Sequence, residues 1–192
     1  MKLREYQNNI AIQAANKLTA FGCCYLSMEC RTGKTLTALY AADKFSAKRV
    51  LFITKLKAIP SVKNDYIALQ PSFKLEVVNF ESSHKMTGKY DLVIIDEAHS
   101  LGAYPKPSKR TQEIRTICEG LPVLYLSGTP SPESYSQLYH QFWVCSKSPW
   151  KSYKSFYKWA KEYVYTRQKK VNGSLINDYS CANKPKIDND TR

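Results

Sequence analysis

The tripeptide Gly33-Lys34-Thr35 combines three residue types that together can hold a phosphate group. The apolar run 23–28 before it predicts a strand, and the pattern of 33–45 predicts a helix. Backbone N–H groups in the first turn of a helix lack internal partners and attract phosphate. Glycine permits close approach, Lys34 can reach the β- and γ-phosphates, and the Thr35 hydroxyl can bind Mg²⁺. We expect a phosphate-binding loop here, the simpler alternative being a glycine at a helix start beside an exposed lysine.

Two carboxylates, Asp96 and Glu97, directly follow the apolar run Leu92-Val93-Ile94-Ile95. A phosphate-bound Mg²⁺ requires a nearby carboxylate, and Asp96 fits that position. Glu97 can polarise an attacking water. Two acidic residues after a buried strand can also simply mark the border with solvent. The phosphate loop about sixty residues upstream favours the metal-binding and catalytic interpretation.

Short apolar runs alternate with helical patterns over the first two thirds of the chain. Strands are expected at 23–28, 49–54, 75–80, 92–96 and 123–127, and helices at 4–20, 33–45, 59–69 and 107–119. Such alternation predicts a mainly parallel sheet covered on both faces. Because ligands bind beyond the carboxyl ends of the strands in such sheets, we expect the motifs to meet at one edge.

The four residues Asp96-Glu97-Ala98-His99 spell the DEAH box of superfamily-two helicases. Residues 3–7 resemble the glutamine motif of that family, whose glutamine (here Gln7) contacts adenine. Residues 126–130 resemble motif III, which couples ATP hydrolysis to nucleic-acid contacts, and residues 52–55 resemble a segment that touches nucleic acid. Over about residues 3–165, order and spacing resemble the first RecA-like domain of Swi/Snf-type ATPases, especially compact phage-encoded ones.

This resemblance implies a RecA-like P-loop NTPase fold, a three-layer α/β sandwich around a mainly parallel sheet. It implies the ATP-binding half of a DNA-dependent ATPase, a helicase or translocase, with ATP and Mg²⁺ as ligands and nucleic acid, double-stranded DNA in particular, as partner. A second RecA-like domain, in cis or in trans, would supply the arginine fingers, so we expect weak turnover from this chain alone. The alternative is a nucleic-acid-binding or regulatory module that keeps the fold without efficient turnover.

The resemblance also implies roles for individual residues. Nucleotide contacts fall on Gln7, Arg31, Thr32, Gly33, Lys34 and Thr35; metal contacts on Thr35 and Asp96; catalytic roles on Lys34, Glu97 and His99; coupling or nucleic-acid contacts on Thr54, Lys55, Ser127, Gly128 and Thr129. Two residues depart from the usual loop, because Met28 and Arg31 stand where relatives often have glycine. Arg31 must tolerate the loop backbone there, where non-glycine residues are disfavoured at positive φ, or it adds a phosphate contact.

The formal net charge of +13 over 192 residues predicts attraction to a polyanion such as nucleic acid. No stretch of about 18 apolar residues is present, so no membrane span or membrane partner is expected. The six cysteines form no CxxC pair, which argues against a zinc site or a disulfide framework. We therefore expect reduced, mostly buried thiols in a cytoplasmic protein. The resemblance to phage-encoded ATPases implies the cytoplasm of a bacterium or of a phage-infected host cell.

We divide the chain into a RecA-like domain at 1–145, a helical basic-aromatic extension at 146–170 and a polar tail or truncated end at 171–192. Residues 147–170 contain eight Lys and Arg residues against one acid, Glu162, with aromatic residues between them. The aromatic residues recur at helical spacing, which favours a helix packed on the domain. The lysine face is a candidate DNA or interface surface. No strand is expected after about residue 132.

Overall fold

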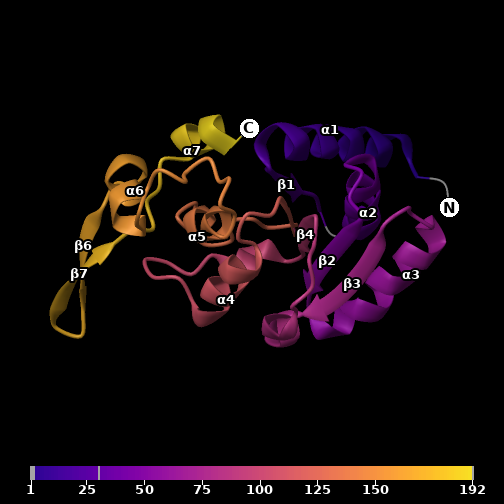
Figure 1. Ribbon diagram of the computed structural model, residues 1–192. Helices are drawn as coiled ribbons and strands as arrows, with labels where there is room; N and C mark the ends of the chain where they lie inside the picture. Colours follow the sequence, from indigo (N-terminus) through magenta and orange to yellow (C-terminus); the bar gives the residue numbers. More distant parts are fainter. Residues whose placement is uncertain (1–2, 30, 192) are drawn as a thin grey trace.

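The computed structural model describes residues 3–29 and 31–191, and its centre is a five-stranded sheet (Figure 1). The strands are β1 (Cys23–Ser27), β2 (Arg49–Thr54), β3 (Lys74–Asn79), β4 (Leu92–Ile95) and β5 (Val123–Ser127). Their spatial order is β1-β5-β4-β2-β3, and each neighbouring pair is parallel. The predicted alternation of strands and helices is confirmed. The arrangement is compatible with the RecA-like fold that the sequence suggests.

Helices cover both faces of the sheet, because side chains along each strand point alternately to opposite sides. On β2, Val50 and Phe52 pack in one core cluster, while Leu51 and Ile53 pack in the other. The first cluster lies under α1 (Glu5–Phe21), α2 (Lys34–Lys44) and α3 (Ile59–Leu69). The second lies under α4 (Lys109–Ile117) and α5 (Gln137–Trp143). Three layers therefore result, with the central strands β4 and β5 buried throughout and the edge strands β1 and β3 partly exposed.

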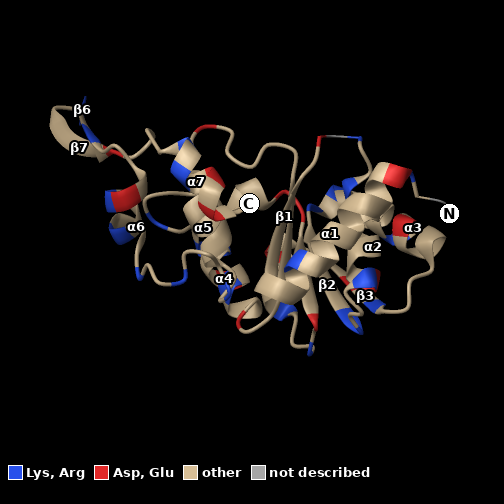
Figure 2. Cartoon of the chain, turned by 90° about the horizontal axis from the view of Figure 1, so that it is seen from above, with Lys and Arg blue, Asp and Glu red and all other residues tan. Residues whose placement is uncertain are grey.

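The chain beyond α5 contains regular structure that the sequence analysis did not predict. It forms α6 (Phe156–Tyr163), an antiparallel hairpin of β6 (Arg167–Val171) and β7 (Ser174–Asp178), and α7 (Lys184–Thr191). Figure 2 shows Lys and Arg on α6 and β6. The expectation that strands end near residue 132 is wrong. The proposed border between 146–170 and 171–192 is wrong as well, since it cuts through the hairpin.

The aromatic residues of this C-terminal segment mostly pack inward. Trp150, Phe156, Trp159 and Tyr163 are all at most 5% exposed and belong to the core cluster on the second face of the sheet. Ile187 of α7, which is 0% exposed, belongs to the same cluster. The packing interpretation is confirmed for these residues, and the segment expected as a tail instead completes the core. Tyr157 and Tyr165 are exceptions and lie exposed.

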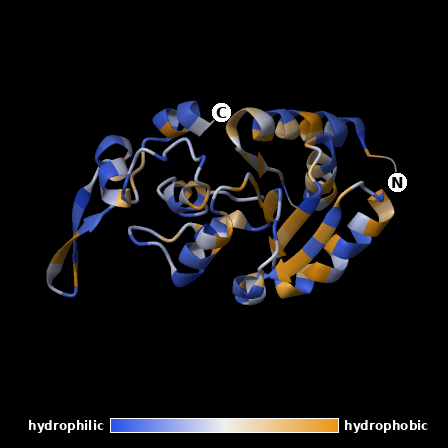
Figure 3. Cartoon of the chain, viewed as in Figure 1, coloured by the Kyte–Doolittle hydropathy of each residue, from blue (hydrophilic) through white to orange (hydrophobic). Residues whose placement is uncertain are grey.

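Apolar residues gather in the sheet and along the inner sides of the helices (Figure 3). Among residues 3–29 and 31–191, no helix combines the length and apolar character that crossing a membrane requires. The five described cysteines carry free thiols, and Cys24, Cys118 and Cys145 are buried as expected. Cys30, for which the same was expected, lies outside the described residues.

His140 of α5 is buried, and its Nδ1 lies 2.6 Å from the carbonyl oxygen of Ala103. Burial lowers the pKa of His140 from its ordinary value of 6.5 to about 4, although the hydrogen bond acts in the opposite direction. In acid, the unfolded chain therefore takes up a proton here before the folded chain does. This residue stabilises the fold above pH 6.5, and its contribution is lost as the pH falls from 6.5 towards 4.

We expect His140→Gln to flatten the acid part of the stability profile. At pH 4 the native protein loses about 3 kcal/mol through His140, because each unit of pKa shift corresponds to about 1.4 kcal/mol. Denaturant unfolding at neutral pH and at about pH 4 measures this loss. The carboxylates titrate alike in the native protein and in His140→Gln. The difference between their losses of unfolding free energy therefore isolates the contribution of His140. Equal losses in the two proteins would show that His140 does not cause the acid sensitivity.

Candidate functional site

The predicted site residues gather at the carboxyl edge of the sheet. Backbone hydrogen bonds continue past the strand ends: the Met28 N–H donates to the Ser127 oxygen over 3.1 Å, and the Asp96 N–H donates to the Ile53 oxygen over 2.9 Å. The loop after β1 therefore starts beside the end of β5. The carboxylate after β4 starts beside the end of β2.

The predicted phosphate loop joins β1 to α2, and its glycine takes the positive φ that glycine tolerates best. Gly33 takes φ 81° immediately before α2, whose first two residues are the half-buried Lys34 and Thr35. Arg31 is exposed and takes φ 65°, so the residue that replaces a customary glycine adopts a conformation that glycine favours. The Thr32 hydroxyl donates to the Glu29 carbonyl oxygen over 2.7 Å. The loop is thus fixed at the N-terminus of α2, where free N–H groups attract anions.

Two side chains of α1 hold this loop from outside. Tyr6 donates its hydroxyl to the Thr32 carbonyl oxygen over 2.8 Å, and Gln7 Nε2 donates to the same oxygen over 3.1 Å. The Gln7 Oε1 accepts the Arg4 N–H over 2.9 Å, so both ends of the amide are bonded within the protein. Gln7 was expected to contact adenine, which would require an exchange of one of these bonds. The sequence analysis gave Tyr6 no role at the site, because tyrosine on an amphipathic helix gives no distinguishing signal.

Gly33→Ala is expected to disturb the loop more than Gly120→Ala, a matched change at φ 74° with nothing within 4 Å of the added carbon. In both variants an alanine at positive φ strains the backbone and destabilises the fold by about 1–2 kcal/mol. At Gly33 the new methyl would also lie 2.3 Å from Gln7 Nε2, so the bond to Thr32 must give way. Denaturant unfolding should show the larger loss at Gly33. A loss no greater than that of Gly120→Ala would contradict the contact between α1 and the loop.

Asp96 is 9% exposed, and its Oδ2 accepts the Thr54 hydroxyl over 2.8 Å. Burial raises the pKa of the Asp96 carboxyl, as does the Glu97 charge, whereas the Thr54 bond and the Lys34 charge act in the opposite direction. Lys34 is therefore close enough for its charge to act on Asp96. A buried carboxylate whose ionisation is disfavoured gains from a further cation. Asp96 and the Thr35 hydroxyl in the first turn of α2 are the residues that could hold a metal ion.

Thr54 was expected to contact nucleic acid, but the structure gives its side chain a different role. Its side chain is 0% exposed and is used to hold Asp96, so it is not available to a nucleic acid in this structure. Lys55, the next residue, is exposed at the same edge of the sheet. A threonine hydroxyl at the end of β2 reaches Asp96 because β2 and β4 are direct neighbours.

A chain of polar contacts links the end of β4 to the loop after β5. Glu97 Oε2 lies 3.3 Å from His99 Nδ1, and that nitrogen lies 2.9 Å from the Ser127 hydroxyl oxygen. The same hydroxyl oxygen accepts the Thr129 N–H over 3.1 Å. Ser127 is completely buried, and Gly128 lies between it and Thr129. The structure therefore places the DEAH-box residues Glu97 and His99 beside the segment that resembles motif III.

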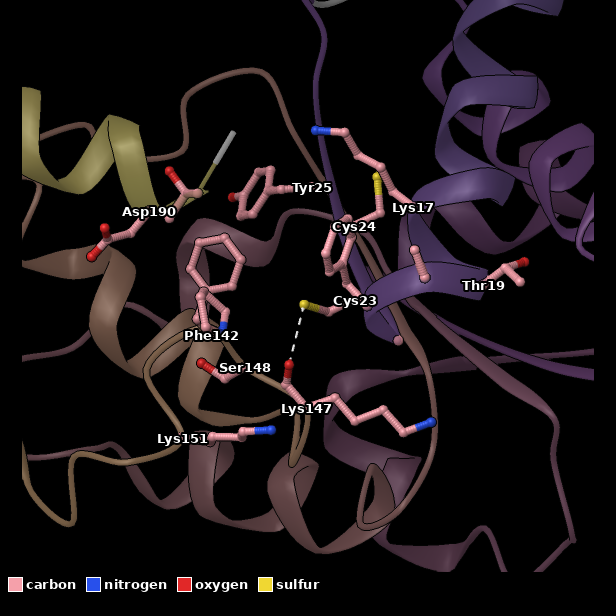
Figure 4. A pocket seen from close by; sticks show the side chains of 15 residues that line it. Lys17, Thr19, Cys23, Cys24, Tyr25, Phe142, Lys147, Ser148, Lys151 and Asp190 are labelled. Carbon is pink, nitrogen blue, oxygen red and sulfur yellow. Dashed lines mark hydrogen bonds between the residues drawn. The ribbon is translucent and has the colours of Figure 1, made fainter.

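A cavity of about 560 Å³ lies at the opposite end of β1 and is not part of this edge (Figure 4). Its lining includes Lys17, Cys23, Tyr25, Phe142, Lys147 and Asp190. The Cys23 thiol donates to the Lys147 carbonyl oxygen over 3.7 Å. Cys23 begins β1, whereas the phosphate loop follows Ser27 at the other end of this strand. The cavity and the candidate site are thus separate features.

No protein-family model and no curated protein matches this sequence. Among solved structures, the chain is similar to a nuclease-deletion mutant of the Type ISP restriction-modification enzyme LlaGI in complex with a DNA substrate mimic. The two are 17% identical with a TM-score of 0.49, and the match covers 68% of this chain and 18% of that one. At this identity and TM-score the likeness carries no functional argument.

Proposed function

We propose that this chain binds MgATP and hydrolyses it as the ATP-binding domain of a nucleic-acid-dependent motor of the superfamily-two helicase type. The observation that carries the proposal is the meeting of three features at one sheet edge. These are the phosphate loop at the start of α2, the buried Asp96 and the chain of contacts from Glu97 to Ser127. The motif sequence supports the finer proposal of a Swi/Snf-type, phage-like relative that tracks double-stranded DNA.

The loop residues suit a polyphosphate. The α2 N-terminus offers backbone N–H groups at the positive end of the helix dipole, and the positive φ of Gly33 leaves its backbone open to close approach. Lys34 would pair with the outer phosphates, and Thr32 and Arg31 lie in the same loop. We propose that Gln7 contacts the adenine base of ATP. Its hydrogen bond to the Thr32 carbonyl oxygen would then link the adenine to the phosphate loop.

The residues present also suit Mg²⁺, which would be held by the Thr35 hydroxyl and Asp96. When bound, Mg²⁺ neutralises charge on the phosphate oxygens. Thr54 fixes one carboxylate oxygen of Asp96 and so orients the other. Because burial disfavours the ionised carboxylate, a divalent cation here would be bound where charge compensation is most needed.

We propose that Glu97 acts as the base for hydrolysis. It would accept a proton from the water whose oxygen bonds to the γ-phosphorus. The bond from that phosphorus to the bridging oxygen breaks, and ADP leaves with the electron pair. His99 holds Glu97 and contacts Ser127, so a nucleic acid that shifts the 127–129 loop would alter the position of the base. A second, arginine-bearing domain would complete the site, and without it we expect turnover reduced by about 10³–10⁵.

The test is single-turnover ATP hydrolysis, with excess protein and with or without duplex DNA. We expect DNA to raise the rate of phosphate release. We expect Glu97→Gln to reduce that rate by about 10²–10⁴, the usual contribution of a general base, while leaving ATP affinity nearly unchanged. Glu119→Gln, which removes an exposed carboxylate after α4, is the matched control.

Two results would overturn the proposal. Hydrolysis by Glu97→Gln at the native rate would remove the assigned base. DNA binding without any ATP binding would favour a module that keeps the fold but does not turn over. Rapid DNA-stimulated turnover by this chain alone would leave the ATP site in place and refute only the need for a second domain.

A further inference from the structure

The β6–β7 hairpin extends away from the body of the molecule (Figure 1). All five residues of β6 and the first four of β7 are exposed. Three of them are apolar, with Val171 39%, Leu175 67% and Ile176 48% exposed. A lone two-stranded hairpin is marginally stable in water, and exposed aliphatic side chains add to its cost. These exposed aliphatic side chains make the hairpin a candidate contact surface.

The base of the hairpin is firmly attached, so its tip has a defined direction. The Tyr165 N–H donates to the Cys181 oxygen over 2.8 Å, and the Asn183 N–H donates to the Tyr163 oxygen over 2.7 Å. On the neighbouring loop, the Ser134 hydroxyl donates to the Ser180 oxygen over 2.7 Å. The hairpin is thus fixed to the domain that carries the candidate ATP site.

The charge of the hairpin is strongly positive (Figure 2). It carries Arg167, Lys169 and Lys170 against Asp178 as its acid. Arg167 lies opposite Asp178, so the two lysines are the cations nearest the tip. The adjacent α6 adds Lys158 and Lys161. A polyanion complements this surface better than a protein partner would, because a protein interface is usually depleted of lysine.

The register gives each face of the hairpin a cation beside an aliphatic side chain. Lys169 lies opposite Ile176 on one face, and Lys170 lies opposite Leu175 on the other. A duplex groove offers phosphates on both walls and sugar and base surfaces between them. The major groove of DNA is wide enough for a two-stranded ribbon. The two-sided pattern fits this environment, whereas docking on a flat protein surface would need only one face.

We infer that the β6–β7 hairpin is a nucleic-acid-contacting element that enters a groove of duplex DNA. This inference deepens the proposed function and rests on its nucleic-acid partner. The lysines contact backbone phosphates on both walls, and Leu175 and Ile176 contact the floor of the groove. The hairpin thereby gives the ATP-binding domain a second DNA contact that is separate from the 127–129 loop.

The experiment is fluorescence anisotropy of a labelled DNA duplex, without nucleotide, at about 50 to 200 mM salt. We expect Arg167→Ala/Lys169→Ala/Lys170→Ala to weaken binding roughly tenfold or more and to lower the slope of log affinity against log salt by up to about 2.7. The control is Lys44→Ala/Lys48→Ala/Lys74→Ala, which removes equal charge at the amino edge of the sheet. It should change the slope much less.

The aliphatic contacts have a different signature. Leu175→Ser/Ile176→Ser should weaken binding but leave the salt slope unchanged, because no phosphate contact is lost. Native affinity and slope in both hairpin variants would overturn the inference. If the variants instead changed sedimentation of the protein without changing DNA binding, the hairpin would serve contact with a second copy.

Failure of this inference and failure of the proposed function are separable. MgATP binding is measured on the same proteins, and the hairpin variants should bind it as the native chain does. Loss of ATP binding in every protein, the native chain included, would refute the ATP site and leave the DNA result standing.

Discussion

We expect Lys34→Ala to weaken the binding of MgATP by roughly 10- to 100-fold, the effect of losing one hydrogen bond to a charged group, about 1.5–3 kcal/mol. Lys34 is the first residue of α2, directly after Gly33 with its positive φ. Its charge opposes the rise that burial causes in the pKa of Asp96, which links Lys34 electrostatically to the proposed metal-binding carboxylate. Equilibrium titration with a fluorescent ATP analogue measures the change.

The matched control lies on the same helix. Lys44→Ala makes the same chemical change at an exposed residue in the last turn of α2, away from the phosphate loop. It should leave ATP affinity unchanged. If both variants bound ATP as tightly as the native chain, the tripeptide would be an ordinary helix start with an exposed lysine.

Trp159→Ala is expected to lower the free energy of unfolding by about 3–5 kcal/mol, the usual cost of truncating a buried large aromatic residue. Trp159 is 0% exposed and stacks on Tyr163 with ring centroids 5.0 Å apart. It also contacts Trp150, Phe156 and Tyr139 at centroid distances of 5.2–5.6 Å. Within the described part of the chain its Nε1 has no hydrogen-bond partner, so the loss comes from packing alone.

This prediction tests whether the C-terminal segment is part of the domain's core. Trp159 shares its cluster with Leu51 and Ile53 of the central sheet, so one cooperative transition should shift as a whole. Tyr157→Ala, on the same helix at a residue 44% exposed, should change stability by less than about 0.5 kcal/mol. A separate early transition for Trp159→Ala would mean that the segment folds independently of the sheet.

The sheet and the main site residues could be predicted from sequence for a physical reason. Strands buried on both faces need continuous apolar runs, and 49–54 and 123–127 are found as strands within the predicted bounds. In a parallel sheet the residues after each strand meet at one edge. The phosphate loop and Asp96 therefore lie at the same edge, because each follows a strand of one parallel sheet.

The role of Thr54 depends on information that local sequence does not contain. Its hydroxyl reaches Asp96 only because β2 pairs with β4 in a particular register. The same holds for Tyr6 and Gln7, whose bonds to Thr32 join segments about 25 residues apart. Resemblance to a family assigned Gln7 to the nucleotide, while the structure shows what it holds within the protein.

The C-terminal hairpin did leave a signal in the sequence. Asn172-Gly173 takes positive φ at both residues, 48° and 83°, and this dipeptide is a strong hairpin signal. Strand β6 is rich in lysine, and neither flanking strand shows apolar alternation, which made the segment resemble a tail. The sequence signal for helix α7 is weaker, because Ile187 is the only buried residue of this helix. Packing of the helix depends on the aromatic cluster that Ile187 joins.

The central claim is that the phosphate loop and Asp96 form one MgATP site. The most direct test is titration of ATP with and without Mg²⁺, in the native chain and in Asp96→Asn. The variant keeps an oxygen for the Thr54 hydroxyl and removes a carboxylate whose ionisation burial disfavours, so it should fold at least as stably. We predict that Mg²⁺ strengthens ATP binding to the native chain and has little effect on Asp96→Asn. Equal Mg²⁺ dependence in the two proteins would contradict the account.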